Sequence, residues 1–230
     1  MKIVVLSGAG ISAESGVKTF RDSNGLWEDH DVMEVASLNG WHANPALVLN
    51  FYNKRRSQLK QVVPNQAHKI CADLERYHEV TVVTQNVDDL HERGGSGHVI
   101  HLHGSLLKAR PVDDDTLEYD WSEDINLGDT NESGIQLRPA IVWFGEAVPL
   151  IGPAMDIIKK CEILIIIGTS LQVYPAASLV GYAGRAEQIY IVDPNFVESY
   201  ETRILKDKLI IIKENAVSGM KKVFDKIQNG

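Results

Sequence analysis

Short runs of aliphatic and β-branched residues recur along the chain, and they constrain its fold more than any other feature. The runs are Ile3–Leu6, Val80–Val83, Val99–Leu102, Ala140–Trp143, Ile163–Ile167, Ile189–Val192 and Leu209–Ile212. Continuous apolar strands, rather than alternating ones, are typical of a parallel sheet that is covered on both faces. Helix-like segments lie between the runs, so the sequence predicts an α/β fold with a doubly wound, Rossmann-like parallel sheet.

The segments between the runs carry signals for helix starts. Asn44 can cap a helix whose first turn holds Pro45, and the helical pattern continues to about Gln61. We expect two further helices over residues 65–76 and 216–227, because an asparagine stands at the start of each segment.

Two stretches interrupt this alternation of strand and helix. We expect residues 19–61 and 105–137 to form a smaller inserted domain, the second stretch being acidic and short of strong strands. Residues 1–18, 62–104 and 138–230 would form the Rossmann-like domain. The length of 230 residues fits one catalytic unit of this kind.

Composition and charge exclude several kinds of partner and site. The chain has 31 acidic and 23 basic residues, a net charge of −8, which disfavours a nucleic-acid partner. The apolar runs are too short to cross a membrane, and the first residues form a strand-like run rather than a secretory signal, so we expect a cytoplasmic protein. Cys71 and Cys161 stand far apart, which fits neither a disulfide framework nor a four-thiolate zinc site.

A glycine-rich turn follows the first run. Gly8, Ala9 and Gly10 begin a GxGxxA variant of the dinucleotide-binding fingerprint, in which glycines let the backbone approach a pyrophosphate at a helix N-terminus. The usual acidic residue about 20 positions later has no clear counterpart, because Asp22 and Asp29 lie in a segment with the composition of a loop rather than after a strand. An ordinary nicotinamide dehydrogenase is therefore a poor fit.

Five motifs occur in the order that is typical of one protein family. They are Gly8–Val17 with Thr19–Arg21, Thr84–Asp88, His103–Gly104, Arg138–Pro139 with Val142–Glu146, and Gly168–Leu171 with Val173–Ala176. Through this set the chain resembles the sirtuins, which are NAD-dependent protein-lysine deacylases. The resemblance implies that NAD is consumed, giving nicotinamide, deacylated lysine and O-acyl-ADP-ribose. An NAD glycohydrolase and an inert module that binds NAD or ADP-ribose are the alternatives.

The resemblance also implies roles for single residues. His103 would be the general base for a ribose hydroxyl, since a histidine with a pKa of about 6.5 can be neutral at physiological pH. Asn86 would hold the ribose and a water, and Asp88 the nicotinamide carboxamide. The other positions that match cofactor contacts are Gly8, Ala9, Gly10, Glu14, Phe20, Arg21, Gln85, Gly168, Thr169, Ser170 and Asp193.

Neighbouring histidines allow a second interpretation of this region. Alternation along a strand places His101 and His103 on one face, close enough to share a metal ion, whereas His98 would face away. Metal binding is therefore an alternative to the general-base role.

The chain departs from the family between His103 and Arg138. Most sirtuins carry two cysteine pairs there that bind a structural zinc, and this segment has no cysteine. We expect no structural zinc, and we expect Leu117, Tyr119 and Trp121, which would share one face of a strand, to hold the segment by packing.

Two loops and one helix would bind the substrate. The resemblance places an acyl-lysine peptide, as an added strand, between loops that contain Val142, Phe144, Gly145, Glu146, Val173 and Tyr174. Tyr52 and Arg55 share one face of the expected helix. They match the Tyr-x-x-Arg motif with which class III sirtuins read the distal carboxylate of succinyl- or malonyl-lysine, and Ala36 matches the small residue that widens their acyl pocket. We therefore predict a preference for succinyl over acetyl groups, the alternative being a solvated Lys54–Arg56 cluster.

Overall fold

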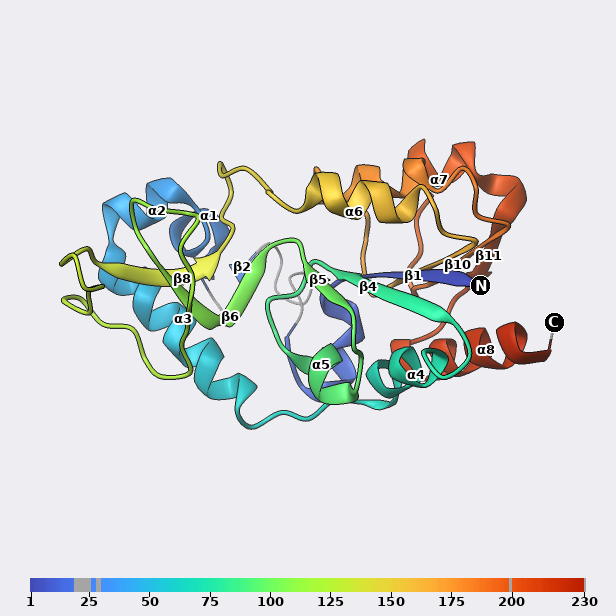
Figure 1. Ribbon diagram of the computed structural model, residues 1–230, viewed down its shortest axis with the longest axis horizontal. Coiled ribbons are helices and arrows are strands. Elements are labelled where there is room, and N and C mark those ends of the chain that lie inside the picture. The colour runs from blue at the N-terminus through green and yellow to red at the C-terminus, as the bar shows by residue number, and fades with distance from the viewer. Residues whose placement is uncertain (19–25, 28–29, 199, 230) are drawn as a thin grey trace.

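A six-stranded parallel sheet forms the centre of the computed structural model, which describes residues 1–18, 26–27, 30–198 and 200–229. The strand order is β11-β10-β9-β1-β4-β5 (Figure 1). The strands are β1 (Lys2–Ser7), β4 (Glu79–Thr84), β5 (Val99–His101), β9 (Ile163–Ile167), β10 (Gln188–Val192) and β11 (Leu209–Ile212). Six of the seven predicted runs thus belong to this sheet, and the α/β fold is confirmed.

Helices cover both faces of the sheet (Figure 1). One face carries α4 (Gln66–Leu74), α5 (Leu90–Gly94) and α8 (Ala216–Asn229), and the other carries α6 (Ile151–Ile158), the 3-10 segment η3 (Ala176–Tyr182), α7 (Tyr200–Ile204) and η4 (Lys206–Lys208). Ile3 and Val5 of β1 lie in the core on the α4 and α8 side, whereas Val4 and Leu6 lie in the core on the α6 side. Both faces of the strand are buried, which explains its continuous apolar sequence.

Side-chain caps start the helices near the predicted positions. The helix α3 (Pro45–Leu59) begins after Asn44, whose side chain accepts a hydrogen bond from the Leu47 N–H. Asn65 caps α4 in the same way through the Ala67 N–H. The segment after β1 differs from the expectation of one helix, because it forms two 3-10 turns, η1 (Ala9–Ile11) and η2 (Ala13–Ser15). Gly16, at φ +93°, ends the second turn before a longer helix can form.

A smaller part of the molecule lies beside the parallel sheet (Figure 1). It holds α1 (Val32–Val35), α2 (Leu38–Ala43), α3, the short pair β2 (Leu26–Trp27) and β3 (His30–Asp31), and an antiparallel sheet of order β7-β6-β8. These last strands are β6 (Gly104–Pro111), β7 (Tyr119–Asp120) and β8 (Leu137–Ile141).

Two expectations about this part are wrong. The run at 140–143 is not a strand of the parallel sheet, because β8 pairs antiparallel with β6. All five residues of β8 are buried, so its sequence looks like that of a parallel strand. The segment after His103 also holds a strand of eight residues, β6, although it contains Lys108 and Arg110. The division of the chain at residues 104 and 138 remains a proposal.

The segment between His103 and Arg138 is held differently from the expected packing. Leu117 and Tyr119 are exposed, and of the three predicted residues Trp121 alone packs against the core of the smaller part. Ile125 anchors this segment instead, and its side chain is fully buried. Its N–H donates to Asn53 Oδ1 and its carbonyl accepts from Asn53 Nδ2, each at 3.0 Å, so the α3 side chain pairs with the segment as a strand would.

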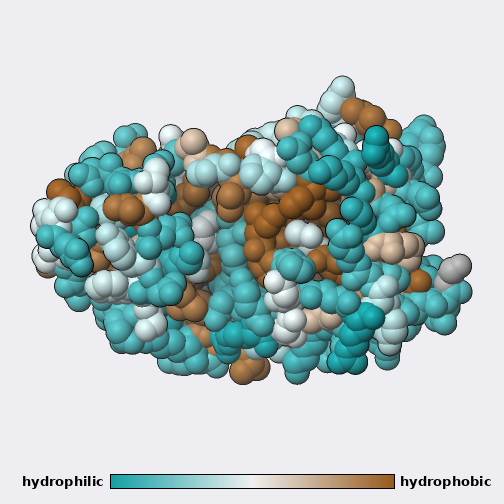
Figure 2. All heavy atoms as spheres, viewed as in Figure 1, coloured by the Kyte–Doolittle hydropathy of each residue, from teal (hydrophilic) through white to brown (hydrophobic). Residues whose placement is uncertain are grey.

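The face of the molecule drawn in Figure 2 is largely polar, with a local exception. Figure 2 shows apolar side chains gathered in the middle of one face, beside helix α6. Among the helices of the described residues, none is long and apolar enough to cross a membrane.

Candidate active site

Two glycine-containing loops meet where the order of the sheet reverses. From β1 the chain continues to β4 on one side, and the later strand β9 pairs on the other side, which is where α/β proteins bind ligands. The Gly8 N–H donates to the Ile167 carbonyl (3.0 Å) and the Gly10 N–H to the Gly168 carbonyl (2.8 Å). A Cβ atom on Gly168 would lie 2.2 Å from the Ile11 nitrogen, and its φ of +64° also favours glycine. The glycines therefore allow the two loops to touch.

The loop after β4 brings its polar side chains to the same place. Ser12, from the first loop, donates to Asp88 Oδ2 (3.0 Å) and accepts from Asn86 Nδ2 (3.2 Å). Gln85 Nε2 donates to Thr169 Oγ1 (3.0 Å), which links this loop to the one after β9. Burial, the largest influence, raises the pKa of Asp88. Sequence reasoning missed Ser12 as a partner, although it lies inside the glycine motif.

His103 is held in one tautomer by the main chain. Its Nδ1 lies 3.0 Å from the Gln85 carbonyl oxygen, which can only accept, so the hydrogen is on Nδ1. Burial lowers the pKa of His103 and outweighs the opposing effect of this hydrogen bond. The ring is therefore neutral at physiological pH, and the lone pair of Nε2 can accept a proton.

The metal interpretation of the histidines finds no support in the geometry. His101 Nδ1 lies 3.0 Å from the Asn86 carbonyl oxygen and Nε2 lies 2.6 Å from Glu92 Oε1, so both nitrogens are engaged. In the described ranges, no group of three or more His, Cys, Asp or Glu side chains could hold a metal ion.

Other predicted cofactor residues have different environments. Asp193 is buried at the carboxyl end of β10, where Oδ1 accepts from the Asn195 N–H (2.7 Å). Glu14 is turned away toward α8, since its carboxylate accepts from the Val217 N–H (2.8 Å). Phe20 and Arg21 lie outside the described residues.

Tyr52 and Arg55 lie inside the smaller part of the molecule. Tyr52 is fully buried and Arg55 is 7% exposed, so the alternative of a solvated cluster is wrong. The Arg55 guanidinium carbon lies 4.4 Å from the centre of the Trp27 ring. Tyr52 Oη accepts from Trp143 Nε1 (3.0 Å), and burial, which outweighs the Trp143 bond and the Arg55 charge, raises the pKa of Tyr52. The phenol therefore keeps its proton, and within the described part of the chain no acceptor lies against it.

The loop after β8 connects Ala36, at the end of α1, to His103. The Val142 N–H donates to the His103 carbonyl (3.0 Å), and the Phe144 N–H donates to the carbonyl of buried Ala36 (2.8 Å). Gly145 follows with a φ of +93°. The predicted peptide-binding loop thus touches both His103 and Ala36, the residue of the predicted acyl pocket.

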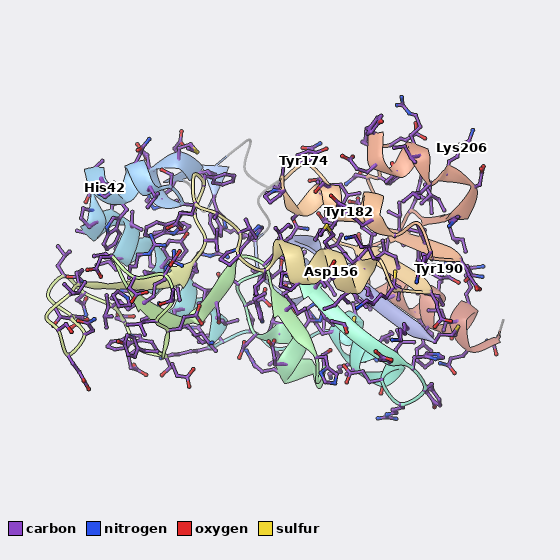
Figure 3. The ribbon with its side chains drawn as sticks, turned by 45° about the horizontal axis from the view of Figure 1, so that its top comes forward. His42, Asp156, Tyr174, Tyr182, Tyr190 and Lys206 are labelled. Carbon is purple, nitrogen blue, oxygen red and sulfur yellow. The ribbon has the colours of Figure 1, made fainter. Side chains whose placement is uncertain are left out.

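The second predicted peptide loop lies just before η3 in the chain. Tyr174 is 61% exposed, and its hydroxyl donates to Glu201 Oε1 (2.5 Å), while Val173 is half-buried. Figure 3 places Tyr174 at the end of the larger part that faces the smaller one. Ser170 is half-buried nearby in sequence, in the loop after β9.

Glu146 has a structural role that the sequence did not indicate. Its carboxylate accepts two hydrogen bonds from Arg138 Nη2 (2.7 and 2.9 Å), one from Arg110 Nη2 (3.0 Å) and one from the Trp143 N–H (2.7 Å). The Arg138 guanidinium carbon also lies 3.7 Å from the centre of the Trp143 ring. The side chain of Glu146 is therefore used inside the protein, and its backbone alone remains for a peptide.

Comparisons with known proteins agree with this arrangement. A model of the Sir2 family matches residues 8–175. An NAD-dependent protein deacylase of Helicobacter pylori is 55% identical over 225 residues, which cover 98% of this chain and 96% of that protein. A Sir2 homolog–NAD complex superposes with a TM-score of 0.87 at 34% identity, covering 99% of this chain and 90% of the other. A Sir2 protein bound to acetylated peptide superposes with a TM-score of 0.79 at 27% identity, covering 99% and 94%.

Proposed function

The chain belongs to the Sir2 family, and on that basis we propose that it removes succinyl and malonyl groups, as well as acetyl groups, from protein lysines. It is an NAD-dependent protein deacylase with NAD as co-substrate. The finer proposal concerns which acyl groups the pocket accepts.

The observation that carries the proposal is the pair formed by Arg55 and Tyr52. Both side chains are buried on one face of α3, so a guanidinium and a phenol lie side by side away from bulk water. Arg55 lies over the Trp27 ring, and this cation–π contact orients the guanidinium. A carboxylate at the end of an acyl chain is the group that such a pair of donors recognises best. An acetyl group has no carboxylate and would use the pocket without this contact.

The residues at the carboxyl ends of the parallel strands fit a bound dinucleotide. Gly8, Gly10 and Gly168 carry no side chain where two loops touch, and Asp193 presents a carboxylate that can accept from ribose hydroxyls. NAD, when bound, supplies the glycosidic bond to nicotinamide that breaks and the ribose that receives the acyl group.

The chain's own residues then orient the reactants and move one proton. Asn86 holds the ribose and Asp88 holds the carboxamide, each positioned through Ser12. His103 Nε2 accepts the proton of a ribose hydroxyl, because the Gln85 carbonyl keeps the other ring hydrogen on Nδ1. One water is consumed, and the products are nicotinamide, deacylated lysine and O-acyl-ADP-ribose.

The test is the substitution Arg55→Met, assayed on one peptide that carries succinyl- or acetyl-lysine at the same position. A hydrogen bond to a charged group contributes about 1.5–3 kcal/mol, so kcat/KM for the succinyl peptide should fall roughly 10- to 150-fold. The acetyl peptide should react nearly as before, since methionine keeps much of the volume of the arginine stem.

Two controls make the result specific. Lys54→Met removes the neighbouring, exposed cation of α3 and should leave both rates unchanged. His103→Ala should abolish peptide-dependent nicotinamide release on both substrates while NAD still binds. If Arg55→Met lowers kcat/KM equally on both peptides, Arg55 stabilises the fold and does not recognise the acyl group. Nicotinamide release that needs no peptide would indicate an NAD glycohydrolase.

A further inference from the structure

Two histidines connect the end of β5 to the loop that carries Asn86. His101 and His103 flank the buried residue Leu102 and each places Nδ1 3.0 Å from a main-chain carbonyl, that of Asn86 and that of Gln85 respectively. A carbonyl oxygen can only accept, so both Nδ1 atoms carry hydrogen. Consecutive carbonyls of one loop are thus held by the last residue of β5 and by the second residue after it.

The two rings differ at their other nitrogen. His101 Nε2 lies 2.6 Å from Glu92 Oε1 on α5, whereas no described side chain occupies His103 Nε2. A carboxylate and a carbonyl are both acceptors, so His101 must donate from both nitrogens and is an imidazolium. The geometry therefore places a cation two residues before the neutral base.

The side chains and carbonyl that surround His101 favour the protonated, cationic form of its ring. Burial is the largest influence and lowers the pKa of His101, but the bond to Glu92, the charges of Glu92 and Asp88 and the Asn86 carbonyl together raise it above its ordinary value. The ionisation of Glu92 is consistent with a cationic His101. Burial raises the pKa of the Glu92 carboxyl, but the hydrogen bond to His101 helps to lower it below its ordinary value. His91, also on α5, stays neutral, since burial and then the charges of His68 and His101 lower its pKa to about 3.

We propose that His101, in its cationic form, is a positioning residue that holds the Asn86 carbonyl against β5 and so fixes Asn86 and Asp88 relative to the base His103. This inference rests on the roles proposed above for those three residues. It is independent of which acyl group the pocket prefers.

Loss of the cation should release Asn86 rather than Glu92. A neutral imidazole keeps a single N–H, and a hydrogen bond to a carboxylate is roughly twice as strong as one to a neutral carbonyl. The remaining hydrogen therefore stays on Nε2, and the Nδ1 lone pair then faces the Asn86 carbonyl.

The pH profile follows from the two rings. The pKa of His103 is lowered, so its ring loses its proton below pH about 6.5. As the pH rises through that range, kcat/KM should increase, because the neutral ring is the base. The pKa of His101 is raised, so the cation should be lost, and kcat/KM should fall, above pH about 6.5. The expected profile is a bell whose alkaline limb belongs to His101.

Two substitutions separate the two contacts of the ring. In His101→Asn the amide nitrogen takes the place of Nδ1 and can donate to the Asn86 carbonyl, whereas in His101→Gln it takes the place of Nε2 and can donate to Glu92. On the acetyl peptide we expect His101→Asn to retain kcat within about threefold and His101→Gln to lose roughly tenfold, the range of a neutral hydrogen bond. Both variants should lack the alkaline limb, and Glu92→Gln should move that limb to lower pH.

A spectroscopic measurement tests the charge without activity. In the 15N spectrum of the histidine-labelled protein at neutral pH, the signals missing from His101→Asn should be those of a doubly protonated ring. A neutral His101, or equal kcat losses in the Asn and Gln variants, would overturn the proposal. If instead His103→Ala keeps full activity while the His101 variants behave as expected, the assigned base is wrong and the anchoring of the loop stands.

Discussion

Replacing Glu146 by alanine should destabilise the protein strongly, because its carboxylate neutralises two buried cations. Arg138 and Arg110 are 2% and 9% exposed at their side chains, and Glu146 is 16% exposed. The three groups lie on β8, on β6 and in the loop after β8, so the carboxylate ties the antiparallel sheet to the loop that touches Ala36.

The magnitude follows from this burial. Removing one partner of a buried ion pair costs about 3–5 kcal/mol, because the other charge stays out of water without compensation. Stacking on Trp143 and the bond to the Ile141 carbonyl (3.2 Å) remain for Arg138, but Arg110 loses its ion pair. For a protein that is stable by about 5–15 kcal/mol the variant should still fold.

The measurement is urea unfolding followed by tryptophan fluorescence. With an m-value near 2–3 kcal/mol per molar, the midpoint should fall by about 1–2 M. Glu146→Gln, which keeps an acceptor for the Trp143 N–H but not the charge, should fall between alanine and the wild type. The matched control is Glu123→Ala, whose ion pair with Lys60 is exposed, and it should not move the midpoint.

A loss below about 1 kcal/mol in Glu146→Ala would refute the reasoning, because it would mean that the pair behaves as a solvated one. If Glu146→Ala leaves the stability unchanged but raises KM for the peptide, the result would instead support the substrate-binding role that the sequence predicted for Glu146.

Two further predictions concern the glycine contact and the metal content. Gly168→Ala should weaken NAD binding at least tenfold and lower the thermal midpoint, because its Cβ would lie 2.2 Å from the Ile11 nitrogen and the left-handed backbone costs a further 1–3 kcal/mol or so; Gly181→Ala, with nothing within 4 Å, is the control, and equal behaviour of the two variants would contradict the contact. Elemental analysis should find well under one zinc per chain and chelators should not unfold the protein, because the segment between His103 and Arg138 has no cysteine; stoichiometric zinc lost together with the fold would prove this wrong.

Local sequence patterns predicted most elements of the parallel sheet. The run at 163–167 coincides with β9, because a strand covered on both faces needs apolar residues at every position. The run at 209–212 coincides with the edge strand β11, although Ile211 is exposed there. The same pattern misled at 140–143, since β8 is buried on both sides within an antiparallel sheet. Burial alone does not specify the partner strand.

The residue types and their order along the chain were enough to predict the fold, the motif positions at the carboxyl ends of the strands and the caps of α3 and α4, because these depend on neighbours in sequence. Tertiary structure alone decided that Glu146 binds Arg110, 36 residues away, and that His101 faces both Asn86 and Glu92. The charge of His101 and the role of Glu146 depend on which groups surround them at about 3 Å, and those groups come from separate elements of the fold.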